Sequence, residues 1–175
     1  DPLWSRGLGD VYKRQKPESF IVASAIGYYG NRGDEDLDET SAPGSGFLTD
    51  TVIDWESFTD PARDAGIRVI NLRNGIVLSA TGGALGRMLL PWKMGGGGPL
   101  AGGKQWMSWI SLDDEVYAIH HLMMTSSCSG AYNMTAPEPV TQRVFSKTLG
   151  SVLRRPAIAP IPGFTMKILF GELAG

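Results

Sequence analysis

The sequence predicts an α/β protein with a doubly wound parallel sheet, on three observations. A short run of apolar and small residues at 19–25, SFIVASA, is typical of a buried strand and ends in the turn GYYGNRGDE. Apolar residues at three-to-four spacing predict a helix over 47–65, and IRVINLR at 67–73 predicts a second strand. Strand, loop, helix and strand in this order form the repeating unit of such a sheet.

The predicted helix over 47–65 has one apolar face and ends at Gly66. The residues on that face are Leu48, Val52, Trp55, Phe58 and Ala62. Another helix is expected over 83–92, followed by a glycine-rich connection at 95–103 and a strand at 105–111, QWMSWIS. Glycines at this density indicate a backbone that turns tightly or approaches a ligand closely.

Two more helices and a short strand are predicted further along the chain. The first helix begins at Asp113 or Asp114, whose carboxylates can accept hydrogen bonds from unpaired N–H groups at a helix start. Its apolar side would comprise Val116, Ile119, His120 and Met123. AYNMT at 131–135 predicts a strand, and Thr141 caps a helix that contains Val144, Phe145, Leu149 and Leu153. The last residues, 164–175, predict an apolar helix without a cap.

The first fifteen residues differ from the rest of the chain. They show neither strand nor helix periodicity, and the segment DVYKRQ resembles a translated sequencing adapter. We therefore expect residues 1–15 to be a non-native leader, and we expect the chain to be cut at both ends.

Composition and charge exclude several classes of partner. The formal net charge is -2, the pI is near 5.7, and the basic residues are scattered, so neither nucleic acid nor a membrane is an expected partner. Cys128 is the single cysteine, which favours a reducing compartment and predicts a cytoplasmic protein. No metal site is expected, because His120 and His121 are adjacent and point about 100° apart on a helix.

Four segments in sequence order resemble one protein family. They are SAIGYYG at 24–30, WE at 55–56, LRNGIVLSATGGALGRMLLPW at 72–92 and GGPLAGGKQWMSWISLDD at 97–114. Together they resemble the epimerase branch of the extended short-chain dehydrogenases/reductases, which are NAD(P)-dependent oxidoreductases with a small C-terminal domain of unknown function. The resemblance extends from about residue 19 to the end of the chain.

The resemblance implies the C-terminal part of a doubly wound, Rossmann-type parallel sheet with a small mixed α/β region on the substrate side. Residues 16–135 would belong to the NAD(P)-binding domain and 136–175 would begin a small, truncated helical domain. The glycine turn that binds the cofactor pyrophosphate would lie upstream of this sequence. The cofactor would be NADP or NAD, and the partner a small-molecule substrate; the sequence does not indicate an oligomeric state.

Three hydroxyl side chains are the candidate catalytic residues. By the resemblance, Ser24 ends the strand whose last serine or threonine faces the nicotinamide, so its hydroxyl could bond a substrate oxygen. Tyr28 and Tyr29 lie in the same turn, where a phenol could act as a general acid. Alternatively, Ser24 caps the turn and the two tyrosines are packing residues with one hydrogen bond each.

The Tyr-x-x-x-Lys pair of the superfamily is missing. If Glu56 is aligned with the glutamate that often follows this pair, Leu48 and Val52 stand where tyrosine and lysine are expected, and neither can transfer a proton. The only Tyr-x-x-x-Lys match, Tyr12 to Lys16, precedes the serine-bearing strand and overlaps the suspected leader. A non-catalytic protein that binds a dinucleotide therefore stays an alternative to an enzyme.

The resemblance also nominates binding residues. Main-chain groups of Gly75, Ile76 and Val77 would meet the nicotinamide carboxamide, although Ile76 and Val77 also suit a buried strand. The substrate would contact residues after the glycine-rich connection, namely Gln105, Trp106 and Trp109. The alternative for these three is a surface hairpin with its tryptophans in the core. The oxidoreductase hypothesis predicts an unidentified small carbonyl or hydroxyl compound as substrate.

Overall fold

The computed structural model describes residues 16–158, which form two compact units. One unit contains 16–74 and 116–134, and the other contains 75–115 and 135–158. The expected leader at 1–15 and the helix expected at 164–175 lie outside the described residues. None of the described helices is both long and apolar enough to cross a membrane.

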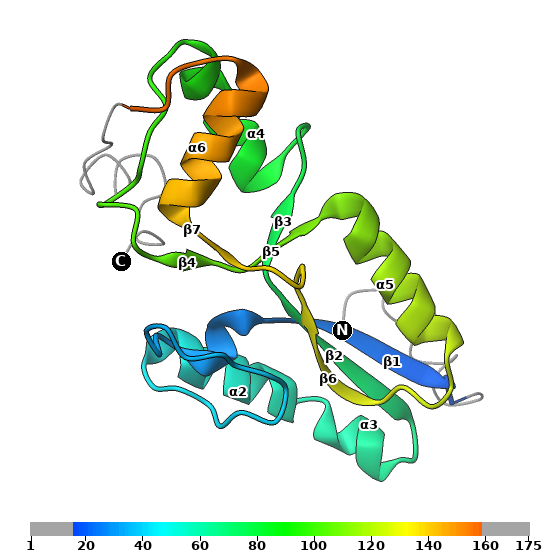
Figure 1. Ribbon diagram of the computed structural model, residues 1–175. Coiled ribbons are helices and arrows are strands. Elements are labelled where there is room, and N and C mark those ends of the chain that lie inside the picture. The colour runs from blue at the N-terminus through cyan, green and yellow to red at the C-terminus, as the bar shows by residue number, and fades with distance from the viewer. Residues whose placement is uncertain (1–15, 159–175) are drawn as a thin grey trace, which may run out of the picture. The chain divides into compact units, whose positions relative to one another are not determined.

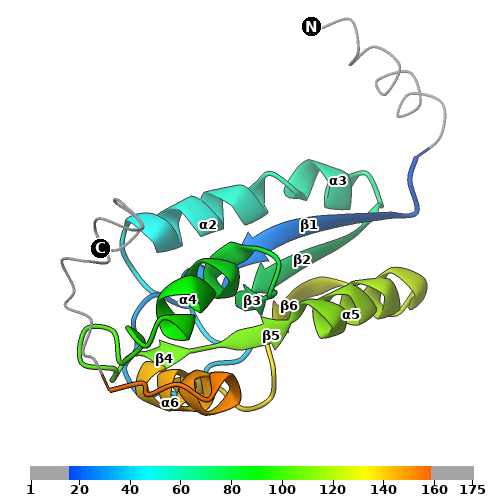
Figure 2. The same cartoon turned by 90° about the horizontal axis from the view of Figure 1, so that it is seen from above.

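The first unit is built on a parallel sheet of three strands in the order β1-β2-β6 (Figure 1). These strands are β1 (Ser19–Ala25), β2 (Arg68–Asn74) and β6 (Gly130–Met134). Helices α2 (Phe47–Ser57) and α3 (Asp60–Asp64) cover one face, and α5 (Leu112–Met124) covers the other (Figure 2). A parallel sheet with helices on both faces confirms the predicted α/β, Rossmann-type fold.

The strand β1 differs from the expected buried strand. It lies at an edge of the three-stranded sheet, and Ser24 is its only buried residue. The central strand β2 is the buried one, with Val69 to Arg73 all enclosed. A middle strand has neighbours on both sides, so it buries more of its length than an edge strand of similar sequence.

The single helix predicted over 47–65 is two helices, and the predicted apolar face was wrong in part. Pro61, near the start of α3, cannot donate a main-chain hydrogen bond, and Thr59 Oγ donates to the Glu56 carbonyl at 2.6 Å. Buried contacts come from Thr49, Val52 and Thr59, whereas the predicted face residues Leu48, Trp55 and Phe58 are exposed. Val52 of the predicted face is thus buried, and the hydroxyl residues Thr49 and Thr59 are buried where large apolar side chains were expected.

The predicted start and face of α5 also need correction. The helix begins at Leu112, and Ser111 rather than Asp113 or Asp114 makes the cap, since its Oγ accepts from the Asp114 N–H at 3.1 Å. The helix packs through Ala118, Ile119 and Leu122 against the core of Ile70, Leu72 and Met134. Of the predicted face, Val116, His120 and Met123 are exposed and only Ile119 is partly buried.

The second unit combines two short sheets and two helices. Strands β3 (Ile76–Leu78) and β5 (Trp109–Ser111) are parallel, and β4 (Trp106–Met107) and β7 (Val140–Thr141) are antiparallel. The one strand predicted at 105–111 is therefore divided between two sheets at Ser108. Helices α4 (Gly83–Lys93) and α6 (Gln142–Leu153) lie close to their predicted bounds, and Thr141 caps α6 as predicted.

Candidate functional site

The candidate catalytic side chains lie at the carboxyl ends of the three parallel strands. Strand register places Ser24 of β1 beside Arg73 of β2, and Arg73 beside Asn133 of β6. The η2 turn (Ile26–Tyr29) follows β1 directly and carries Tyr28 and Tyr29. In open α/β sheets ligands bind at this edge, outside the carboxyl ends of the strands.

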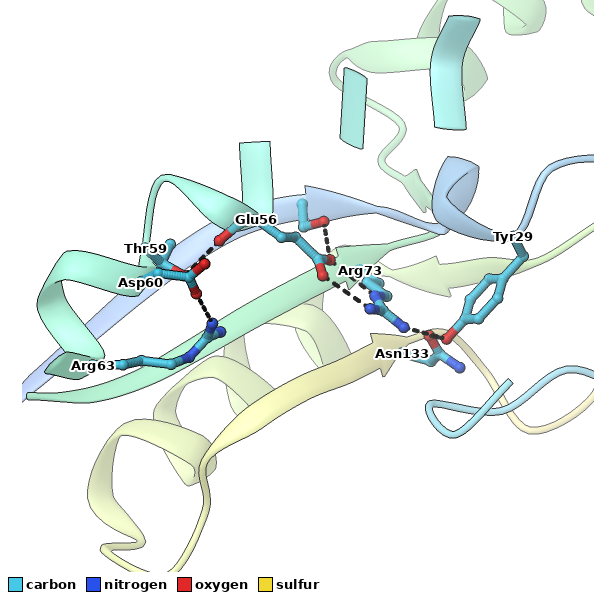
Figure 3. A network of polar contacts seen from close by, with 8 residues as sticks. Tyr29, Glu56, Thr59, Asp60, Arg63, Arg73 and Asn133 are labelled. Carbon is cyan, nitrogen blue, oxygen red and sulfur yellow. Dashed lines mark hydrogen bonds and ion pairs between the residues drawn. The ribbon is translucent and has the colours of Figure 1, made fainter. Parts of the chain in front are cut away.

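A nearly buried ion pair connects these residues (Figure 3). The Arg73 guanidinium binds the Glu56 carboxylate with two nitrogens, Nε and Nη2, each at 2.9 Å. The Ser24 hydroxyl donates to Oε1 of the same carboxylate at 2.7 Å. Burial alone would raise the pKa of Glu56, but the hydrogen bonds from Arg73 and Ser24 hold that pKa below its usual value. The Glu56 carboxyl group is therefore ionised near neutral pH.

Arg73 also fixes both tyrosines of the η2 turn. Its Nη1 donates to the Tyr29 hydroxyl at 3.0 Å, and that hydroxyl donates to Asn133 Oδ1 at 2.7 Å. The guanidinium carbon of Arg73 lies 3.4 Å from the centre of the Tyr28 ring, a stacked cation–π contact. Burial would lower the pKa of Arg73, but its bonds to Glu56 and Tyr29 raise it further above its usual range, so the guanidinium keeps its charge.

The loop between η2 and α2 is attached to the same edge. Gly44 donates its N–H to the Tyr28 carbonyl at 3.0 Å, and a side chain at Gly44 would collide with the Tyr29 carbonyl. Glu39 Oε1 accepts the main-chain N–H of Asn133 at 2.7 Å. This loop carries the acidic run Asp34 to Glu39, yet across residues 16–158 no three His, Cys, Asp or Glu side chains gather as a metal site would require.

Two of the predicted cofactor residues, Ile76 and Val77, lie in β3 of the second unit, and Gly75 directly precedes this strand. The close approach of the backbone at Ser108 requires glycine at position 75, since a Cβ there would lie 2.6 Å from the Ser108 carbonyl oxygen. The Ile76 N–H donates to that oxygen at 2.8 Å, so it is already paired. Successive main-chain groups of a strand point to opposite edges, so those of Val77 point away from β5. Of the three, Val77 best fits the proposed contact with a carboxamide.

The predicted substrate residues lie in the same unit but in different surroundings. Gln105 is exposed and donates its side-chain N–H to the Leu100 carbonyl at 3.1 Å, which closes the glycine-rich connection. Trp106, in β4, is half exposed. Trp109, in β5, pairs with Ile76 of β3. The indole N–H of Trp109 is buried without a hydrogen-bond partner among the described residues. These three residues thus do not form one cluster with Ser24, Tyr28 and Tyr29 inside either compact unit.

Sequence reasoning missed three members of the network. Glu56 served only for alignment, Arg73 was expected to pair with a carboxylate or a helix end as a structural residue, and Asn133 received no role. One signal could have pointed to them: Arg73 and Asn133 are polar residues near the ends of apolar strands that the α/β pattern places side by side. The serine-to-glutamate bond has no comparable signal, because Glu56 lies on a helix and the sequence pattern does not show which side chain it faces.

The chain is similar to curated proteins that are named as epimerase family proteins. The chain is 43% identical over 156 residues to an epimerase family protein of Mycobacterium bovis, covering 89% of this chain and 52% of that protein. It is 40% identical over 157 residues to the chloroplastic epimerase family protein SDR39U1 homolog of Arabidopsis thaliana, covering 90% and 45% of the two chains. The chain thus spans about half the length of these relatives. No protein-family profile matches it.

Solved structures share the fold. The human epimerase family protein SDR39U1 (isoform 2), solved with NADPH, has a TM-score of 0.81 and 28% identity, covering 97% of this chain and 58% of that one. A nucleoside-diphosphate sugar epimerase from Corynebacterium glutamicum has a TM-score of 0.74 and 32% identity, with 97% and 39% coverage. The Thermus thermophilus UDP-glucose 4-epimerase, at 18% identity and a TM-score of 0.68, supports the fold alone.

Proposed function

Because this chain belongs to the epimerase family, an atypical branch of the extended short-chain dehydrogenases/reductases, we propose that the whole protein is an NAD(P)-dependent oxidoreductase. Its substrate would be a small carbonyl or hydroxyl compound. The observation that carries this proposal is the network of Ser24, Glu56, Arg73, Tyr28 and Tyr29 at the carboxyl edge of the sheet. Three hydroxyl groups there are held in fixed positions, as proton transfer to a reacting oxygen requires.

The proposed cofactor is NADP or NAD. The human relative solved with NADPH supports this choice, and so do the main-chain groups of Val77, which point away from the neighbouring strand. Bound nicotinamide would supply or accept the hydride. We propose that Gly75, Ile76 and Val77 bring this stretch of backbone to the carboxamide, and that Gln105, Trp106 and Trp109 contact the substrate. A buried indole donor at Trp109 suits a ligand acceptor.

Residues 16–135 would belong to the NAD(P)-binding domain and 136–175 to a small C-terminal domain. The two compact units divide the chain differently, because 75–115 group with 135–158. All the proposed catalytic, cofactor and substrate residues lie within 16–135, although they are divided between the two compact units.

We further propose a cytoplasmic protein; the Arabidopsis relative is named as chloroplastic.

A non-catalytic dinucleotide-binding protein is the second candidate, and one observation favours it. The positions that would carry the tyrosine and lysine hold Leu48 and Val52; Val52 is buried and Leu48 is exposed. Neither side chain can exchange a proton, so an enzyme must use another group.

Calorimetric titration of the whole protein with NADPH and NADH, followed by a screen of small aldehydes and ketones, tests the proposal. We expect saturable binding of at least one cofactor and its oxidation by some carbonyl compounds. Binding without turnover across the screen would favour the non-catalytic candidate, and no binding of either cofactor would refute both.

A further inference from the structure

The three candidate hydroxyl groups have different hydrogen-bond partners. The Ser24 proton lies in its 2.7 Å bond to Glu56. The Tyr29 hydroxyl accepts from Arg73 and donates to Asn133, and its side chain is buried. Within residues 16–158 the Tyr28 hydroxyl makes no hydrogen bond, and this side chain is partly exposed. Only Tyr28 can offer its proton to a ligand without breaking a bond in the network.

The Tyr28 ring is nevertheless held firmly. One face stacks on the Arg73 guanidinium, and the ring meets that of Tyr29 edge to face, with centres 5.3 Å apart and planes at 85°. The Tyr28 carbonyl accepts the Gly44 N–H. A fixed ring with an unbonded hydroxyl is the arrangement that a general acid needs before substrate arrives.

We propose that Tyr28 is the catalytic residue that exchanges a proton with the substrate, and that Ser24, Glu56, Arg73 and Tyr29 are positioning residues. This assignment rests on the proposed function, because it needs the hydride that the cofactor supplies. It replaces the missing Tyr-x-x-x-Lys pair with a tyrosine from the turn and a cation stacked on its ring.

In the direction of reduction, bound NAD(P)H would give a hydride to the carbonyl carbon and become NAD(P)⁺. The carbonyl π pair would take the Tyr28 proton, which forms the substrate O–H bond. The electrons of the broken phenol O–H bond stay on Tyr28 as phenolate, whose charge Arg73 stabilises through the ring. Solvent water then returns a proton to the phenolate. Oxidation of an alcohol runs through the same bonds in reverse.

The test uses the whole protein with tyrosine labelled by ¹³C at Cζ, and the Tyr28→Phe variant assigns the Tyr28 signal. We expect NADPH or NADH, whichever binds in the calorimetric titration, to shift the Tyr28 signal. The signal of Tyr117, which is 73% exposed on α5, should stay in place. Cofactor binding that leaves the Tyr28 signal unmoved would overturn the assignment.

A kinetic comparison completes the test with the best carbonyl compound of the screen. Tyr28→Phe should keep the melting temperature and KM and lower kcat by about a hundredfold to ten-thousandfold, the usual contribution of a general acid. Tyr117→Phe should match the unmodified protein in melting temperature and kcat. Tyr29→Phe should lower the melting temperature, and its effect on kcat should be smaller than that of Tyr28→Phe. An unchanged kcat in Tyr28→Phe would refute the role of Tyr28. Absence of cofactor binding or of any turnover would instead refute the proposed function.

Discussion

At the scale of single residues, Glu56 is the centre of the polar network. Its carboxylate binds Arg73 through two nitrogens and accepts the Ser24 hydroxyl, so three segments of the chain meet at one side chain. Burial of this pair is nearly complete, with side-chain exposures of 5% for Arg73 and 13% for Glu56. A charge left in such a place without its partner is costly.

Glu56→Gln should therefore destabilise the protein strongly. The amide keeps the size of the carboxylate but leaves the Arg73 charge uncompensated, so we expect a loss of about 3 to 5 kcal/mol in the free energy of unfolding. Chemical denaturation of the whole protein measures this loss. Asp54→Asn, on the exposed side of α2, is the matched control and should change stability by about 0.5 kcal/mol or less. Equal losses in both variants would contradict a special role for Glu56.

The same ion pair predicts a pH dependence. Because the pKa of Glu56 is lower in the folded protein than in the unfolded chain, its contribution is fully present above the unfolded value. That contribution disappears as the pH falls through the folded pKa. Unfolding measured from neutral to acid pH should show a shallower acid loss in Glu56→Gln than in the unmodified protein. Identical slopes would show that Glu56 does not titrate with folding.

Gly75 offers a test of why glycine stands in the predicted cofactor stretch. Gly75→Ala would place a methyl group 2.6 Å from the Ser108 carbonyl oxygen, so we expect a loss of about 1 to 3 kcal/mol even without cofactor. Gly82→Ala is the control, because its φ of -170° suits any residue and nothing lies within 4 Å of its added Cβ. Thermal unfolding without cofactor measures both, and equal melting temperatures would contradict the close approach to Ser108.

The sequence nominated three residues of the polar network but not their partners. Ser24, Tyr28 and Tyr29 were nominated from their places near the end of a strand and in the turn that follows it, and all three contact the Glu56–Arg73 ion pair. Their partners were missed because a hydrogen bond depends on side-chain direction. Periodicity places Ser24 and Glu56 on two elements, but it does not reveal that they face each other.

At the scale of elements, the positions of most helices and strands were predictable, and their buried faces were not. On α5 the buried side includes the charged residue Glu115. Because a charged residue is not expected in the core, the sequence pattern places the buried face too far toward Val116 and His120. On α2, Leu48 and Trp55 are exposed while Thr49 is buried. The division of 105–111 between two sheets depends on pairing with β3 and β7, which are distant in sequence.

The start of α5 depends on Ser111, which exchanges hydrogen bonds with Asp114. Its Oγ accepts the Asp114 N–H at 3.1 Å and donates to Asp114 Oδ2 at 2.8 Å. Ser111→Ala should cost about 1 kcal/mol in the free energy of unfolding, as the loss of a helix cap does. Ser127→Ala, which changes an exposed serine after the helix, should cost much less. If both variants unfold alike, the cap at Ser111 contributes nothing.

At the scale of the whole molecule, the two compact units carry different parts of the proposed chemistry. The unit of the β1-β2-β6 sheet contains the hydroxyl groups and the ion pair, and the other contains Gly75 to Val77 and the two candidate tryptophans. The chain spans about half the length of these relatives, so the activity is proposed for the whole protein. Function should therefore be measured on the whole protein.

Label transfer shows whether the whole protein carries out hydride transfer. NADPH and NADH, each deuterated at both positions of the reactive ring carbon, would be incubated with the protein and the carbonyl compounds of the screen, and the products analysed by mass spectrometry. We expect one deuterium on the former carbonyl carbon of an alcohol product, with transfer strongly reduced in Tyr28→Phe. Saturating cofactor binding without deuterium in any product would contradict an oxidoreductase and leave a protein that binds the dinucleotide without using it.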